Sequence, residues 1–313
     1  MKNPILTRGA AAMLVFFGAA MASSAAPAVD CDGTLLRDYG GVKRAMKLAD
    51  GGIAAFSKLN INIDGYARAY HLKNADAGAL IHLCNAGRVY LPDGRLYEGS
   101  QDNATCTGRF MEDVARIGAA GWNDPTVGVV EWYGILGTGA VKLRGRDIAH
   151  IIPVFQKDGS GFAVSPTKLE DTSIEDLSDQ SRYVNPLRVP AAVVPRALLQ
   201  AGVEMGSFGV AFDLKKRVAV PFVVGDSGPR IGEGSVALAR LVAGLAPKDD
   251  IERGERFAGQ VDSANVLWIF FKDTARGFDS HDEAATLRLA REAYATWGGE
   301  ARLQACARKV PRN

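Results

Sequence analysis

The stretch Val218–Leu245 reads VAVPFVVGDSGPRIGEGSVALARLVAGL and places a glycine-rich run between two regular segments. The apolar residues Val218–Val224 predict a strand, because a run of apolar and β-branched residues bounded by glycine is typical of one. The second segment is rich in alanine and leucine and predicts a helix over Ser235–Ala243, with Ser235 as its N-cap. The stretch therefore predicts a strand, a turn and a helix in succession.

Two carboxylates lie in the glycine-rich run, Asp226 and Glu233, seven positions apart. Glycine allows backbone conformations that other residues avoid, and loops frequently carry catalytic side chains. Such a loop can direct both carboxylates toward one substrate atom. We interpret Asp226 and Glu233 as a candidate acid/base pair.

Short β-favouring segments separated by turn residues extend from about Gly52 to Phe222. Asp64-Gly65 and Pro92-Asp93-Gly94 are two of these turns. Few helical stretches intervene, so we predict a mainly β fold with a barrel-like core and peripheral α-helices. The expected strands are Ile61–Ile63, Arg88–Leu91, Val127–Tyr133, Ile151–Gln156, Gly161–Ser165, Ala191–Val194, Gly209–Asp213 and Val218–Val224, and the expected helices are Asn74–Cys84, Ser235–Ala243 and Asp282–Trp297.

The N-terminus has the three parts of a secretory signal peptide. Lys2 and Arg8 precede the apolar stretch Ala10–Met21, which small residues follow up to Ala26. We predict a signal peptide over residues 1–26, a catalytic domain over 27–273 and a helical C-terminal extension over 274–313. The mature protein is expected to be secreted or periplasmic, without stable membrane insertion; an uncleaved N-terminal anchor is the alternative.

The charge balance argues against nucleic acid as a partner. Removal of residues 1–26 takes away two basic residues and leaves equal numbers of basic and acidic side chains. The longest basic cluster, Lys215–Arg217, follows Asp213-Leu214 and is most simply a hairpin turn. A nucleic-acid-binding protein normally has a concentrated basic surface, which this pattern does not predict.

The chain has four cysteines, and an even number in an exported protein favours two disulfides. Three pairings are possible. A bond between Cys84 and Cys106 would close a local loop and leave Cys31 and Cys306 to join the two ends of the chain. The sequence alone does not choose among the three pairings. The cysteines are too scattered for structural zinc, and the histidines lack metal-ligand spacing, so no metal and no cofactor are expected. The histidines are His71, His82, His150 and His281.

A serine protease is one alternative, because Gly225–Pro229 looks like the nucleophile segment of chymotrypsin-like enzymes. His82, Asp147 and Ser227 occur in the corresponding chain order. However, the segment lacks the second glycine of that pattern, and His82 lies inside an expected helix.

Five ordered blocks resemble the fungal-type chitosanases of glycoside hydrolase family 75, which also occur in bacteria. The resemblance spans roughly Gly52–Leu245. The blocks are Asn62–Gly65 with Ala69–His71, Leu83–Gly87 with Pro92–Gly94, Ala163–Leu169, Arg182–Asn185 with Val189-Pro190 and Val194-Pro195, and Gly225-Asp226 with Ile231–Ser235.

The resemblance implies an inverting glycoside hydrolase that acts on the polysaccharide chitosan. It makes Asp226 the general base and Glu233 the general acid, with the two carboxyl groups roughly 6.5–9.5 Å apart so that a water fits between substrate and base. Arg230 lies between them and is expected to counter the charge on Asp226. The expected substrate-binding residues are Asp64, Tyr70, His71 and Arg230.

The chain departs from the family pattern in two ways that concern the substrate. Its loop between the two carboxylates is shorter, and Asn62 and Asn185 stand where the family has aspartates. Chitosan is a polyamine, so its cleft benefits from additional carboxylates. A peptidoglycan-active glycosidase with the same pair is therefore an alternative, as is a glycan-binding barrel without catalytic activity.

Overall fold

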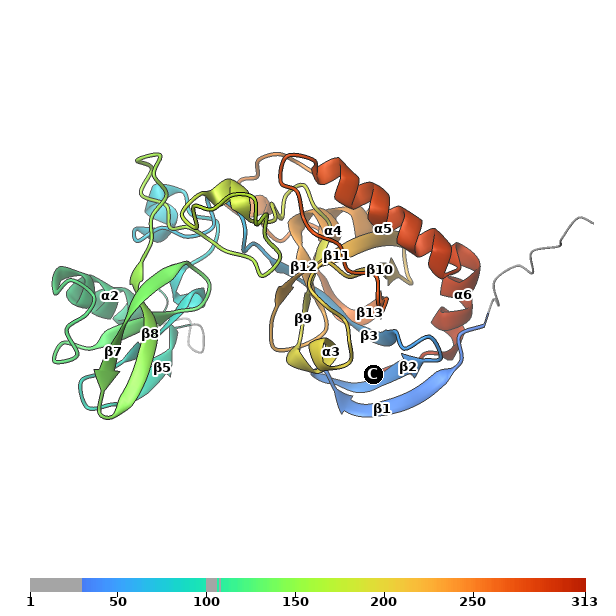
Figure 1. The fold of residues 1–313 in the computed structure, drawn as a ribbon, viewed down its shortest axis with the longest axis horizontal. Helices are drawn as coiled ribbons and strands as arrows, with labels where there is room; N and C mark the ends of the chain where they lie inside the picture. The colour runs from blue at the N-terminus through green and yellow to red at the C-terminus, as the bar shows by residue number, and fades with distance from the viewer. Residues whose placement is uncertain (1–29, 100–105, 107) are drawn as a thin grey trace, which may run out of the picture.

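The computed structural model describes residues 30–99, 106 and 108–313 (Figure 1). The expected signal peptide lies outside the described residues. The fold is mainly β, with 32% strand and 23% helix, and contains a closed six-stranded barrel with peripheral helices. The predicted fold class is confirmed.

The barrel is a mixed sheet that closes on itself. Its strand order is β3-β12-β9-β11-β10-β13, and β13 pairs with β3 to complete the ring. Pairing is parallel between β3 and β12 and between β9 and β11, and antiparallel elsewhere in the ring. The strands are β3 (Ile53–Asn62), β9 (Ala191–Val194), β10 (Phe208–Asp213), β11 (Val218–Ser227), β12 (Glu233–Ser235) and β13 (Val261–Phe270), and β1 (Gly33–Tyr39) and β2 (Val42–Leu48) continue the sheet beside β3.

Successive residues of the barrel strands point alternately into two apolar clusters, one on each face of the sheet, as the two-residue period of a strand requires. Phe222, Trp268 and Phe270 pack together in one cluster. The other lies beneath the C-terminal helices α5 (Glu283–Trp297) and α6 (Gly299–Lys309), where Trp297 stacks on Phe271. Both faces of these strands are therefore buried.

A second lobe is inserted between β3 and β9 and lies beside the barrel (Figure 1). Its described residues form a three-stranded sheet, a hairpin and an α-helix, which pack around an apolar cluster that Val236 of the barrel lobe also joins. The Pro92–Gly94 turn joins two antiparallel strands, as predicted. The elements are β4 (Gly87–Tyr90), β5 (Leu96–Glu98), β6 (Val129–Trp132), β7 (Gly137–Leu143), β8 (Arg146–Pro153) and α2 (Arg109–Ala119).

Two of the three expected helices are present. The backbone N–H of Leu238 donates to the Ser235 hydroxyl at the start of α4 (Val236–Val242), and Asp282 caps α5 in the same way. The chain also forms α2, α3 (Arg196–Gln200) and the short 3₁₀ helices η4 (Gln180–Arg182) and η5 (Arg253–Glu255), which the sequence did not predict, whereas α6 lies within the predicted helical C-terminal extension.

The expected helix Asn74–Cys84 is wrong. The segment forms two short 3₁₀ helices, η1 (Asn74–Ala77) and η2 (Leu83–Asn85). Gly78 ends the first with φ of 81°, and the Asn74 side chain accepts a hydrogen bond of 2.7 Å from the backbone N–H of Leu83. These two features fold the segment into a closed loop.

The expected strand Gly161–Ser165 is also wrong, because the segment forms only isolated bridges, such as Phe155 with Ala163.

Two disulfides form, as expected, and the structure selects one of the three possible pairings, with Cys84–Cys106 within the second lobe and Cys31–Cys306 between the two ends of the described chain. The second bond fastens α6 next to β1, so residues 274–313 lie against the barrel. No helix within the described ranges is both long and apolar enough to cross a membrane.

Candidate active site

The strand order brings the two candidate carboxylates to neighbouring positions on the barrel. Asp226 and Glu233 both align with Val193, Asp226 from β11 on one side and Glu233 from β12 on the other. Residues aligned across neighbouring strands point to the same face of a sheet. Asp226 is at the end of one strand and Glu233 at the start of another, and each is half-buried. The pair is therefore held by a sheet, which positions it more firmly than the loop expected from the sequence.

Two strand spacings separate the backbones of Asp226 and Glu233, about 9.5 Å. This backbone separation is compatible with the carboxyl separation that inverting glycosidases use, roughly 6.5–9.5 Å. Gly228 leaves room for the Glu233 carboxylate, since a Cβ at residue 228 would lie 2.7 Å from Val193 Cγ1 and 3.2 Å from Glu233 Oε2.

Asp64 provides a third carboxylate at the same site. The Tyr70 hydroxyl donates to Asp64 Oδ1 at 2.8 Å, and the Asn62 amide donates to Oδ2 at 3.2 Å. The backbone N–H of Asp64 in turn donates to Asn62 Oδ1 at 2.7 Å. Asn62 therefore holds Asp64 with an amide donor that an aspartate could not supply.

Asp64 and Asp226 influence each other's ionisation. Burial raises the pKa of Asp226 to about 7, and the charge of Asp64 adds to the rise. Burial likewise raises the pKa of Asp64 to about 6, although the Tyr70 and Asn62 hydrogen bonds oppose the rise. The charge of Glu233 also raises the pKa of Asp64, so the ionisation of the three carboxylates is linked.

A cavity of about 20 Å³ is lined by both Asp64 and Asp226. Its volume is close to that of one water molecule, and Asn62, Thr167 and Ser235 add polar groups to its wall. A water in this position would lie beside a carboxylate able to accept its proton.

Glu233 has a different electrostatic environment. Burial raises its pKa, while the positive charges of Arg230 and Lys58 oppose the rise. The sequence predicts that Arg230 counters the charge of Asp226; in the structure its charge acts on Glu233. The cation beside Asp226 is Lys168, whose backbone N–H also donates to Asp226 Oδ1 at 3.2 Å.

Replacing Asp64 with Asn is expected to shift the acidic limb of the pH profile of kcat/KM to lower pH by about one unit. The base must be ionised, so activity rises with pH through the pKa of the Asp64–Asp226 pair, about 6 to about 7. Without the charge of Asp64, Asp226 ionises at lower pH. The measurement is kcat/KM on a neutral soluble polymer from about pH 4 to 9.

Asp262→Asn is the matched control for Asp64→Asn, because Asp262 is exposed on β13. The control is expected to keep the wild-type profile. An unchanged acidic limb in Asp64→Asn would show that Asp64 does not act on the base.

The structure brings Tyr70 to Asp64, but it places His71 elsewhere. The His71 ring packs edge-on against Phe162, and its Nδ1 accepts a hydrogen bond from the backbone N–H of Lys73. No contact of His71 with the three carboxylates is present among the described residues. Asn185, where the family has an aspartate, accepts from the backbone N–H of Leu187 and shapes a turn.

The proposed protease triad is not assembled. Asp147 lies on the β7–β8 hairpin and pairs with Lys142, whereas Ser227 lies on the barrel at the end of β11. His82 precedes η2 rather than lying inside a helix. Within the described part of the chain, these three side chains form no hydrogen bond with one another.

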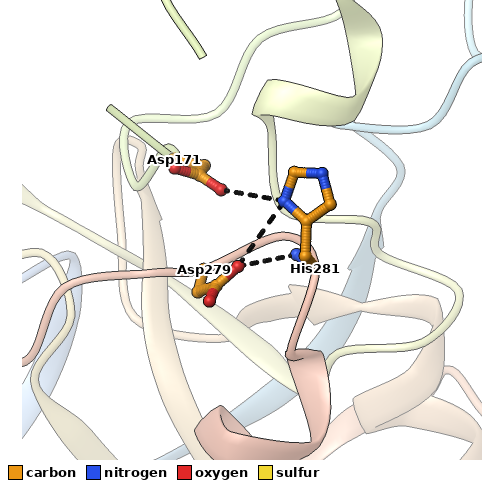
Figure 2. Close-up of side chains that lie close together, drawn as sticks. All are labelled: Asp171, Asp279 and His281. Atoms are coloured by element: carbon orange, nitrogen blue, oxygen red, sulfur yellow. Dashed lines mark hydrogen bonds and ion pairs between the residues drawn. The ribbon is translucent and has the colours of Figure 1, made fainter. Parts of the chain in front are cut away.

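Asp171, Asp279 and His281 form a cluster whose potential ligand atoms all lie within 4.8 Å of one another (Figure 2). Asp171 is buried, and its carboxylate accepts backbone and hydroxyl hydrogen bonds from Ser173 and from Ser280. These donors satisfy both oxygens, so the burial of Asp171 does not require a metal ion. The cluster fastens the loop after Glu170 to the segment that precedes α5.

No protein-family model matches this chain, and a search of the curated proteins finds no match. The function proposed below therefore rests on the geometry and charge of the site and on the sequence resemblance.

Proposed function

We propose that this protein is a glycoside hydrolase that cleaves a β-1,4-linked, glucosamine-containing polysaccharide with inversion at the anomeric carbon. The observation that carries the proposal is the alignment of Asp226 and Glu233 on either side of Val193. Carboxylates whose backbones are about two strand spacings apart can leave room for a sugar and a water, which an inverting reaction requires.

In this mechanism Glu233 is the general acid. It transfers its proton to the glycosidic oxygen as the bond from that oxygen to the anomeric carbon breaks. Burial raises the pKa of Glu233, which favours the protonated form that the role requires, but burial also raises the pKa of Asp226 to about 7, so the assignment of the two roles rests on the sequence resemblance.

Asp226, coupled to Asp64, is the general base. It takes a proton from a water while the water oxygen bonds to the anomeric carbon on the opposite face of the sugar. The small cavity lined by Asp64 and Asp226 is a suitable position for that water. Asp64 acts through Asp226 and is a positioning residue, with Tyr70 and Asn62 fixing its carboxylate.

We also propose that the protein is exported before it acts. Two disulfides form in the described chain, and such bonds persist mainly in oxidising compartments. The N-terminal sequence pattern agrees with this location.

The test is product analysis with soluble chitosan, N-acetylated chitosan and peptidoglycan in parallel. Reducing ends are expected to be released from at least one polymer, and NMR of the first products should show the α-anomer, because a β-linkage is cleaved with inversion. A β-anomeric product would contradict the mechanism, and no reducing ends from any polymer would contradict the activity. Binding without cleavage would support a glycan-binding barrel instead.

A further inference from the structure

Three basic side chains surround the carboxylates of the candidate site. Lys58 lies on β3 two residues before Asn60, which pairs with Glu233. Arg230 lies in the turn between the two carboxylate-bearing strands, and the Lys168 backbone contacts Asp226. The charges of these three residues act on Asp226 or Glu233. The candidate site therefore has cations on several sides.

These cations are not neutralised by neighbouring acids. In the part of the chain that the structure describes, none of the three forms an ion pair within 4.0 Å. The acids that follow Lys168 are already engaged, since Glu170 binds Arg182 through both oxygens at 3.0 and 2.6 Å and Asp171 is satisfied by serines. The three positive charges thus remain available to a ligand.

A groove lies beside Lys168. It has a volume of about 460 Å³ and is lined by Lys168, Leu169, Arg276 and Phe278 among others. The backbone N–H of Leu169 donates to the Gly225 carbonyl at 2.9 Å, so the groove begins directly beside Asp226. Arg276 adds a further cation at a distance from the carboxylates, and Phe278 adds an apolar surface.

The charge of the site does not suit a polyamine. The three carboxylates Asp64, Asp226 and Glu233 are matched by the three cations. Arg276 adds a fourth cation along the groove, and Asn62 contributes no charge. A chain of protonated glucosamines would therefore find no net attraction there, whereas a ligand with carboxylates would be attracted to the cations.

We propose that the natural substrate is an anionic polysaccharide in which the glucosamine nitrogen is acylated and carboxylates are attached to the sugars. This inference rests on the proposed glycosidase function and specifies its substrate class. Lys58, Lys168 and Arg230 recognise the carboxylates next to the scissile bond, and Arg276 recognises one farther along the chain.

Three soluble polymers with related backbones test the substrate class, namely glycol chitosan (cationic), glycol chitin (neutral) and carboxymethyl chitin (anionic). At low ionic strength kcat/KM is expected to be about tenfold higher for the anionic than for the neutral polymer, and lowest for the cationic one. About 0.5 M salt should reduce the anionic preference severalfold, because it screens exposed charges. Faster cleavage of glycol chitosan would overturn the inference and leave the proposed function intact.

The double variant Lys168→Gln/Arg230→Gln is expected to lower the anionic-to-neutral ratio of kcat/KM about tenfold. Lys43→Gln is the matched control, because Lys43 is an exposed lysine on β2, and it should leave the ratio within about twofold. A ratio that the double variant does not change would overturn the inference.

Affinity electrophoresis separates failure of the inference from failure of the proposed function. Retardation of the wild type by carboxymethyl chitin, lost in the double variant, would support the charge recognition even if no polymer were cleaved, and only the proposed function would then be wrong. Equal migration in the presence of carboxymethyl chitin and glycol chitin would overturn the inference.

Discussion

Replacing Glu233 with Gln is expected to lower kcat/KM on a cleavable glucosamine polymer by about a thousandfold, within the range that general acid catalysis contributes. Glutamine has nearly the same shape and lies in the same register beside Val193, but it has no proton to give to the glycosidic oxygen. The measurement is the initial rate of reducing-end release. A circular dichroism spectrum identical to that of the wild type checks that the fold is retained.

The leaving group distinguishes the two catalytic roles. A dinitrophenyl leaving group needs no proton, so Glu233→Gln is expected to keep most of its activity on a dinitrophenyl oligosaccharide. Asp226→Ala should lose activity on this substrate as well, and added azide, which needs no base, should restore turnover with an α-glycosyl azide as product. If Asp226→Ala instead kept its activity on the dinitrophenyl substrate and Glu233→Gln lost it, the acid and base roles would be exchanged. Full activity of both variants on the polymer would exclude the mechanism.

Asp226→Asn is expected to be inactive yet more stable than the wild type at pH 8, by up to about 4 kcal/mol. The folded-state pKa of Asp226 is about 7, well above its ordinary value of 3.8. A carboxyl with a raised pKa favours the folded state when protonated, and this advantage is lost as the pH rises through about 7. Urea unfolding at pH 4 and pH 8 measures the effect, and the difference between variant and wild type should largely vanish at pH 4.

The sequence was sufficient to identify Asp226 and Glu233 as a candidate pair, because both lie in one short run between a strand and a helix. It could not show that they are separated by Val193. That arrangement depends on β9, which is more than 30 residues earlier in the chain and enters the sheet between β11 and β12. Long-range strand order is decided by packing and closure of the barrel, which local patterns do not encode.

The same limit explains the residues that sequence reasoning missed. Lys168 reaches Asp226 through its backbone N–H, a group that every residue except proline carries, so no residue type marks the contact. Lys58 lies near Glu233 because β3 pairs in parallel with β12. Arg230 was identified from the sequence, and its charge acts on Glu233.

Loss of the Cys31–Cys306 disulfide is expected to lower the free energy of unfolding by about 5 kcal/mol. The bond joins residues 275 positions apart, whereas Cys84–Cys106 spans only 22. A longer closed loop removes more conformational freedom from the unfolded chain, so the smaller loop is expected to contribute about 3 kcal/mol. Guanidinium unfolding of the double variants Cys31→Ala/Cys306→Ala and Cys84→Ala/Cys106→Ala measures both effects.

The relative size of these two losses in unfolding free energy shows how the C-terminal helices are attached to the barrel. Besides the disulfide, α6 is joined to the N-terminal end of the described chain by ion pairs of Lys309 with Asp30 and Asp32, which are partly exposed and contribute little. Trp297 stacks on Phe271, and Leu303 is buried, so apolar packing remains after the bond is removed. The variant without Cys31–Cys306 should therefore fold and keep a protected Trp297. A larger loss from Cys84–Cys106 would contradict the loop-length argument and show that the second lobe depends on its disulfide for packing.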